Sequence, residues 1–198
     1  MNIVFDLGAV LIEWDPRHLY RKVFADREKM EWFLTNVCHN DWNLEQDRGR
    51  SFDEAVTEAI ARHPEWEREI KLYRDRWIEM VPGEIPGTVQ ILEELHAKGA
   101  PLYAITNWNG DTFRITKGRF KFLSLFRDIV VSGDEKLVKP NYKIFDLFCL
   151  RNNLDPVNCL FIDDSLKNIK GAQTIGMNTH HFTSPEGLRA DLKRRNLL

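Results

Sequence analysis

The sequence predicts an α/β protein with a doubly wound parallel, Rossmann-like sheet and an inserted helical cap domain. Three observations lead to this fold class: short apolar runs end in polar residues, helical patterns separate the runs, and one long stretch lacks any strand pattern. Alternating strands and helices are typical of parallel sheets, because each crossover between parallel strands needs a long connection. At 198 residues, one core with a sizeable insertion is the natural expectation.

The strand predictions rest on short apolar runs, which are typical of strands buried on both faces of a parallel sheet. The expected strands are 2–5, 101–105, 129–131, 159–162 and, more weakly, 177–182. The carboxyl ends of parallel strands meet at one edge of the sheet, where ligands bind. We therefore expect the polar residues that follow these strands to form a site.

The stretch from residue 14 to residue 86 differs from the rest of the chain. It is rich in Trp, Arg and Glu and shows helical spacing of its apolar residues. We interpret residues 14–86 as an inserted helical cap, and residues 1–13 and 87–198 as the α/β core. Two Pro-Gly pairs, at 82–83 and 86–87, mark the return of the chain to the core.

The composition argues against several classes of protein. The formal charge is only −2 and both signs are interspersed, so neither nucleic acid nor a membrane is an expected partner. No apolar run is long enough to span a bilayer, and the N-terminus lacks the pattern of a secretory signal. The three cysteines lack metal-ligand spacing and suit reduced thiols. We expect a cytoplasmic protein, and the sequence leaves its oligomeric state open.

Polar side chains suited to phosphate chemistry follow the predicted strands. They are Asp6, Thr106-Asn107, Lys139-Pro140 and Asp163-Asp164. Each alone has an ordinary explanation as a turn, a helix cap or a solvated side chain. Together they offer a nucleophile, hydroxyl and amide donors, a lysine and paired carboxylates, which phosphoryl transfer to a carboxylate requires. Converging carboxylates repel one another unless a cation lies between them, and oxygen ligands select Mg²⁺.

The sequence resembles the haloacid dehalogenase-like (HAD) hydrolases over nearly its whole length. The resemblance lies in four ordered motifs, which are Phe5-Asp6-Leu7-Gly8-Ala9-Val10-Leu11-Ile12, Ile105-Thr106-Asn107, Val138-Lys139-Pro140-Asn141-Tyr142-Lys143-Ile144-Phe145 and Phe161-Ile162-Asp163-Asp164-Ser165-Leu166-Lys167-Asn168. Each motif alone is weak, whereas the ordered set is specific. The resemblance implies a Mg²⁺-dependent phosphatase that acts on a small phosphorylated molecule through an aspartyl-phosphate.

The resemblance also implies a metal site with Mg²⁺ as cofactor. Asp6 matches the nucleophile, which is also a metal ligand, and Gly8 matches the position whose backbone carbonyl binds the metal. Asp164 matches the metal-binding carboxylate, and Asp163 matches its direct or indirect partner. Asn168 is a further candidate, for holding a metal-bound water and for the substrate pocket.

Three residues match the phosphate-contacting part of the family site. Thr106 and Asn107 match the second motif, which holds the phosphate. Lys139 matches the lysine that orients both the nucleophile and the phosphate, so the resemblance gives it a catalytic and a phosphate-binding role.

One position departs from the common phosphatase pattern. That pattern has an aspartate two residues after the nucleophile, as general acid and base, and here Gly8 occupies the position. A positioned proton donor is worth roughly 10²- to 10⁴-fold in rate. A similar Asp-Leu-Gly opening occurs in a subgroup that includes sugar-1-phosphate phosphatases, whose anomeric leaving group has less need of an acid. We therefore hypothesise a small sugar phosphate as substrate, phosphorylated at the anomeric carbon.

A few residues outside the motifs are candidates for the substrate pocket. Trp108 directly follows the second motif. The segment from Trp42 to Arg50, which includes Arg48, interrupts the predicted cap helices, and its polar groups could face the substrate or form a solvated turn. The other tryptophans with helical spacing, among them Trp77, are expected in the cap core.

Two other functions stay open at this point. A 2-haloacid dehalogenase would use Asp6 as nucleophile without a metal, which explains Gly8 well but the Asp163-Asp164 pair poorly. A catalytically weak phosphate-binding protein would keep the site and lack the acid.

Overall fold

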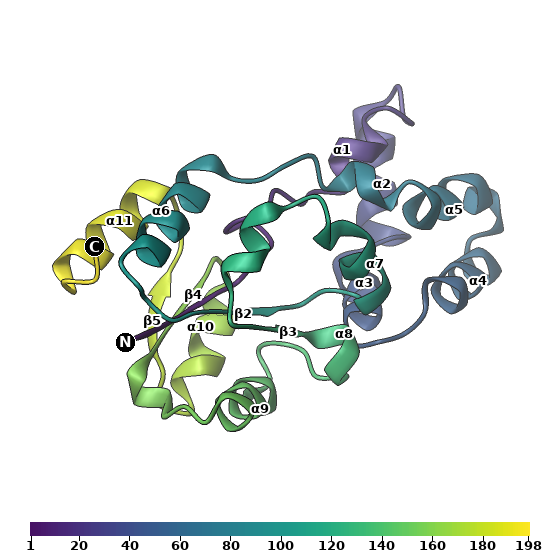
Figure 1. Cartoon of the computed structure of the whole chain (residues 1–198). Coiled ribbons are helices and arrows are strands. Elements are labelled where there is room, and N and C mark those ends of the chain that lie inside the picture. Colours follow the sequence, from purple (N-terminus) through teal and green to yellow (C-terminus); the bar gives the residue numbers. More distant parts are fainter.

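The sheet has five parallel strands in the order β3-β2-β1-β4-β5 (Figure 1). The computed structural model describes all 198 residues. The strands are β1 (Asn2–Phe5), β2 (Leu102–Thr106), β3 (Asp128–Val131), β4 (Cys159–Asp163) and β5 (Asn178–His181). The predicted α/β fold with a parallel sheet is confirmed, and each strand lies at the expected place in the sequence.

Strand β1 occupies the middle of the sheet. Its Phe5 pairs with Ala104 of β2 on one side and with Ile162 of β4 on the other. The chain builds outward from β1 through β2 to β3 and then crosses to β4 on the opposite side. Ligands in such sheets bind where the strand order reverses. The residue that follows β1, Asp6, therefore lies at the centre of the carboxyl edge.

Helices cover both faces of the sheet (Figure 1). Side chains of Ile3 and Phe5 enter a core of 40 buried residues that includes apolar residues of α6 and α11. The side chain of Val4 points to the other face and enters a core of 13 buried residues with α9 and α10. The helices that begin after residue 85 are α6 (Pro86–Ala97), α7 (Gly110–Lys117), η3 (Lys121–Leu125), α8 (Ser132–Glu135), α9 (Tyr142–Asn152), η4 (Pro156–Asn158), α10 (Leu166–Gln173) and α11 (Pro185–Arg194).

Residues 14–86 form helices and no strand, as their sequence pattern predicts. The elements are α1 (Arg17–Tyr20), α2 (Arg27–Asn36), α3 (Asn40–Asp47), α4 (Phe52–Arg62), η1 (Pro64–Trp66), α5 (Glu67–Asp75) and η2 (Trp77–Met80). Helix α4 begins at a capping box, in which Ser51 and Glu54 satisfy each other's backbone N–H groups. Figure 1 shows α2, α4 and α5 gathered beyond one end of the sheet.

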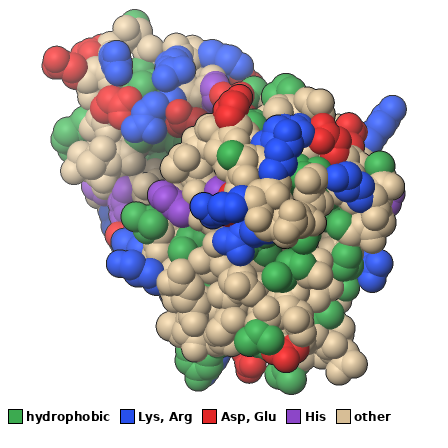
Figure 2. Space-filling view, turned by 90° about the vertical axis from the view of Figure 1, so that its left-hand side faces the viewer, with side chains coloured by type: hydrophobic (Ala, Val, Ile, Leu, Met, Phe, Trp, Pro, Cys, Tyr) green, Lys and Arg blue, Asp and Glu red, His purple; other side chains and the backbone are tan.

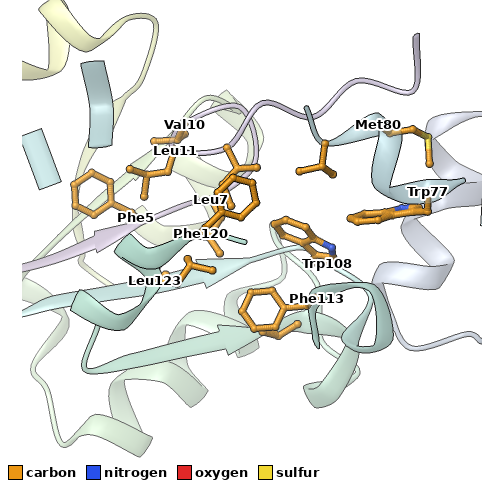
Figure 3. Close-up of a cluster of buried hydrophobic side chains, with 14 of the residues drawn as sticks. Phe5, Leu7, Val10, Leu11, Trp77, Met80, Trp108, Phe113, Phe120 and Leu123 are labelled. Atoms are coloured by element: carbon orange, nitrogen blue, oxygen red, sulfur yellow. The ribbon is translucent and has the colours of Figure 1, made fainter. Parts of the chain in front are cut away.

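The helical segment shares its apolar core with the sheet. The rings of Trp77, from η2, and Trp108, which follows β2, lie with their centroids 5.6 Å apart (Figure 3). Both belong to the larger buried core, together with Leu7 and Phe113. Continuous packing of this kind holds the segment against the carboxyl edge of the sheet.

The surface shows no large region of a single charge on the face drawn in Figure 2, where acidic and basic side chains lie near one another. No helix has both the length and the apolar character that crossing a membrane requires. All three cysteines are free thiols with buried side chains.

Gly171, in α10, lies against the turn that carries Lys139, and it provides a test of this packing. A Cβ atom at Gly171 would lie 2.3 Å from the backbone oxygen of Pro140. We expect Gly171→Ala to lower the free energy of unfolding by about 1–3 kcal/mol, the usual effect of overpacking, in urea unfolding followed by circular dichroism. Gly118→Ala is the matched control, because a Cβ there meets nothing within 4 Å. Equal stability of the two variants would contradict the close packing at Gly171.

Candidate functional site

Asp6 lies where β1 ends, and the backbone around it fixes its carboxylate. Its backbone N–H donates to the Ile162 oxygen at 2.8 Å, which continues the pairing with β4. The N–H of Leu7 donates to Asp6 Oδ1 at 2.7 Å. The side chain is largely buried, with 7% of the residue exposed. The neighbouring Gly8 has room for a side chain, since an added Cβ would meet nothing within 4 Å.

Lys139 is the buried cation of the site. Its Nζ lies 2.8 Å from Asp6 Oδ1 and 2.7 Å from Asp163 Oδ2, and its side chain is 0% exposed. A third hydrogen bond, of 3.0 Å, goes to the backbone oxygen of Ile105. An ammonium group has three donors, so these partners use all of them. The two carboxylates and the lysine are therefore fixed relative to one another.

Asn107 holds the backbone of Lys139 in place. The Lys139 N–H donates to Asn107 Oδ1 at 2.8 Å, and Asn107 Nδ2 donates to the Lys139 carbonyl at 3.0 Å. The end of β2 thus positions the loop between α8 and α9. Thr106, the last residue of β2, directly precedes Asn107 and is buried, with 1% exposed.

Asp163 and Asp164 have different surroundings although they are adjacent. The Asp163 carboxylate accepts from Lys139, from the Ser165 N–H at 2.8 Å and from Asn168 Nδ2 at 3.0 and 3.1 Å. No other residue donates a hydrogen bond to the Asp164 carboxylate, which is exposed. Asp163 therefore orients Lys139, and Asp164 is the carboxylate that is free to bind an ion.

The charges of the site do not balance. Three carboxylates face one ammonium group, which leaves two negative charges when all are ionised. Burial raises the pKa of Asp6 to about 8, with Lys139 opposing the rise and Asp163 adding to it. Burial and Asp163 also raise the pKa of Asp164. A cation bound beside these carboxylates would oppose both shifts, because it favours their charged forms.

The carboxylates have the arrangement that a divalent cation needs. Asp6, Asp163 and Asp164 each offer one oxygen, and these oxygens lie within 4.8 Å of one another. Two oxygens on opposite sides of a Mg²⁺ ion are about 4.2 Å apart, twice the usual bond length. A small inward movement would therefore close Asp6 and Asp164 around one ion.

A cavity of about 270 Å³ lies over Asp6 and Asp164, between the sheet edge and the helical segment. Its wall combines aromatic rings with side-chain amides. The lining residues beyond the aspartates include Gly8, Trp14, Asn40, Asn43, Phe52, Trp77, Asn107, Trp108 and Asn109. A second and more open hollow, of about 660 Å³, lies on the outer side of the Lys139 loop, and none of the three clustered aspartates lines it.

The structure places the sequence candidates for the pocket differently from one another. Trp108 lines the cavity. Trp42, Arg48 and Asn168 do not, which corrects the expectation for these three. Trp42 packs its ring against Tyr73 inside the helical segment, with centroids 5.0 Å apart. Arg48 pairs with Glu45 beside the outer hollow, and Asn168 donates to Asp163.

Sequence reasoning missed several residues of the cavity wall. Trp77 was expected in the core of the helical segment, and its ring both packs against Trp108 and faces the cavity. Asn40, Asn43 and Asp47, on one face of α3, also line the wall. The expectation that residues 42–50 interrupt the helices is wrong, because most of them lie in α3. Their polar character was the available signal, and only the fold shows which of them face inward.

A family model described as haloacid dehalogenase-like hydrolase matches residues 25–182, most of the chain. The chain belongs to the haloacid dehalogenase-like hydrolases. The resemblance to this family is thereby confirmed, and the matched residues include the second, third and fourth motifs.

Relatives of this HAD-like hydrolase include phosphatases and larger proteins. It is 28% identical to a sesquiterpene phosphatase of Aspergillus oryzae, over 91% of this chain and 88% of that protein. It is 33% identical to mouse acyl-CoA dehydrogenase family member 10 over 54% of this chain, and 23% identical to a drimenol cyclase of Aspergillus calidoustus over 96% of it. The chain spans only 10% and 35% of these two longer relatives.

Solved structures share the fold of this HAD-like hydrolase. A HAD family enzyme of Bacteroides thetaiotaomicron, crystallised with magnesium and inorganic phosphate, matches with a TM-score of 0.70 at 23% identity, over 92% of this chain and 93% of that one. A HAD-like hydrolase of Porphyromonas gingivalis matches with a TM-score of 0.71 at 22% identity, over 98% and 97% of the two chains.

Replacing Lys139 tests the charge balance of the site. In Lys139→Met, Asp6 and Asp163 lose their shared cation, and we expect the free energy of unfolding in EDTA to fall by about 3–5 kcal/mol at pH 8. The loss should shrink at pH 5.5. Carboxyls whose folded pKa lies above the unfolded value favour the folded state at low pH, and this contribution is lost as the pH rises.

Urea unfolding at both pH values measures these losses. Lys143→Met is the control, because Lys143 is exposed on α9. A loss for Lys139→Met that is independent of pH, or that matches the control, would contradict the assigned contacts.

Proposed function

We propose that this HAD-like hydrolase is a Mg²⁺-dependent phosphate-monoester hydrolase that forms an aspartyl-phosphate on Asp6. The observation that carries the proposal is the contact of Lys139 with Asp6 and Asp163, next to an unpaired Asp164 on the floor of the cavity. A carboxylate fixed by a lysine and open to a cavity is suited to attack phosphorus. Two relatives, the sesquiterpene phosphatase and a glycerol-3-phosphatase of Arabidopsis thaliana, support phosphatase chemistry by their names.

In the proposed reaction, a carboxylate oxygen of Asp6 forms a bond to phosphorus while the ester P–O bond breaks. Water then attacks the same phosphorus, the bond to Asp6 breaks, and inorganic phosphate leaves. Lys139 keeps Asp6 in position for both steps and places a positive charge next to the phosphate. Thr106 and Asn107, at the end of β2, supply hydroxyl and amide donors at the same edge.

Mg²⁺ is the proposed cofactor, and Asp6, the Gly8 carbonyl and Asp164 would hold it. The ion would neutralise the carboxylates and the phosphate so that a nucleophile and a substrate of like charge can meet. Asp163 takes part through Lys139, because hydrogen bonds already occupy its oxygens.

The cavity wall supports a small sugar phosphate as substrate. Trp77, Trp108 and Phe52 offer aromatic faces, while Asn40 and Asn43 offer amide donors and acceptors. Apolar walls with a few placed polar groups are typical of small-molecule sites, and this mixture suits a sugar with one apolar face and several hydroxyls. The cavity, of about 270 Å³, is slightly smaller than the range of about 300–1,000 Å³ for drug-sized ligands. Its size therefore suits a small substrate.

Asp6→Asn tests the nucleophile. We expect a panel of sugar phosphates to release phosphate with wild-type protein and Mg²⁺, and release to stop in EDTA. Removing a covalent nucleophile can lower kcat by up to roughly 10⁶-fold, so Asp6→Asn should be inactive in the same assay. The exposed Asp146→Asn, on α9, should behave as wild type.

Two outcomes would contradict the proposed function. Halide release from 2-chloropropionate in EDTA, without phosphate release, would make the protein a dehalogenase. Thermal stabilisation by Mg²⁺ with vanadate, but no turnover of any phosphoester, would make it a phosphate-binding protein.

A further inference from the structure

The proposed reaction needs a proton donor for the leaving oxygen, and Gly8 cannot supply one. Only three residues of the cavity wall carry a titratable side chain: Asp6, Asp47 and Asp164. The mechanism already uses Asp6 as nucleophile and Asp164 as metal ligand. Asp47, from the helical segment, is the one carboxyl group in the wall that these roles leave over.

The core of the protein fixes the end of α3, where Asp47 lies. The Ser132 hydroxyl donates to the backbone oxygen of Asp47 at 2.6 Å and accepts from the N–H of Trp108 at 2.9 Å. Asn109 Nδ2 donates to the backbone oxygen of Gln46 at 3.2 Å. Residues that follow β2 and β3 thus fix the backbone of Asp47 above the carboxyl edge of the sheet.

A short chain of hydrogen bonds orients the Asp47 carboxyl. The buried Tyr73 donates its hydroxyl to Asn43 Oδ1 at 3.0 Å, and Asn43 Nδ2 donates to Asp47 Oδ2 at 3.2 Å. Tyr73 fixes the orientation of the Asn43 amide. The amide binds only Oδ2 of Asp47, so Oδ1 has no hydrogen bond to Asn43. A group aimed by an amide and a tyrosine has the support that a catalytic carboxyl needs.

The surroundings favour a carboxyl that both holds and releases a proton near neutral pH. Burial raises the pKa of Asp47 to about 7, and the Asn109 backbone and Lys139 oppose the rise. Asp6 and Asp164 are the other charged groups that share the cavity. The nearby cations of the same segment have partners of their own, Arg48 with Glu45 and Arg50 with Glu58.

We propose that Asp47 is the general acid and base of the reaction, an inference that rests on the proposed function. Protonated Asp47 gives its proton to the ester oxygen as the P–O bond breaks and the bond from Asp6 to phosphorus forms. The Asp47 carboxylate then takes a proton from the water that attacks phosphorus, and the bond to Asp6 breaks. One water is consumed, an alcohol and phosphate are released, and Asp47 is protonated again.

This role of Asp47 widens the range of leaving groups that the enzyme can accept. With an acid on the helical segment, the leaving group need not be an anomeric oxygen, and ordinary alkyl phosphates become substrates. The inserted helical segment would then supply a reacting group as well as cover the site.

The test compares phenyl phosphates whose leaving groups range from phenol to 2,4-dinitrophenol. The measured quantity is kcat/KM with Mg²⁺, which reports on steps up to formation of the aspartyl-phosphate. We expect Asp47→Asn to lose about 10²-fold or more on phenyl phosphate, as removal of an acid does, and only a few-fold on 2,4-dinitrophenyl phosphate, which needs no proton. Asp47→Glu, which keeps the acid, should recover part of the loss on phenyl phosphate. Asp41→Asn, an exposed aspartate of the same helix, should behave as wild type.

The result that overturns the proposal is an equal loss for Asp47→Asn across the whole series, because a role in folding or binding does not depend on the leaving group. Equal activity of Asp47→Asn and wild type on phenyl phosphate would overturn it as well. Asp6→Asn separates this outcome from failure of the proposed function. If Asp6→Asn is inactive on every ester, the phosphatase stands whatever Asp47 does, whereas full activity of Asp6→Asn would refute the phosphatase itself.

Discussion

The structure of the site depends on one buried ammonium group between two carboxylates. An uncompensated charge in a protein interior costs several kcal/mol, so Asp6 and Asp163 can lie under the cavity only because Lys139 contacts both. The lysine in turn needs its third partner, the Ile105 carbonyl, and the two hydrogen bonds between its backbone and the Asn107 side chain, one in each direction. Residues from four strand ends thereby become a single unit.

This arrangement divides the work of the carboxylates. Asp163 is saturated by hydrogen bonds and keeps Lys139 in place, whereas Asp164, one residue later, is exposed and without a partner. Asp6 belongs to both sets, because it contacts Lys139 and shares an ion-sized space with Asp164. In the proposed mechanism, Asp6 would lie between a fixed ammonium group and a bound Mg²⁺ ion, which would hold it firmly and let it accept an anionic phosphate.

Much of the fold and of the site floor could be predicted from the sequence. Buried parallel strands appear in the sequence as short apolar runs. The topology of the sheet brings the polar residues that follow these runs together, and Asp6, Lys139 and Asp163 meet as predicted. The wall of the cavity was harder to predict. It comes from residues 14–86, where Trp42 and Asp47 lie on one short helix yet only Asp47 faces the cavity. Which side of α3 faces the sheet is decided by tertiary contacts at Ser132 and Asn109, far away in the sequence.

A crystal structure with Mg²⁺ and beryllium fluoride, a mimic of a phosphoryl group, addresses the central claim most directly. We expect beryllium bonded to a carboxylate oxygen of Asp6, Mg²⁺ between Asp6 and Asp164, and Lys139 still in contact with Asp6 and Asp163. Beryllium fluoride bound elsewhere, or Asp6 unmodified with no ion beside Asp164, would contradict it.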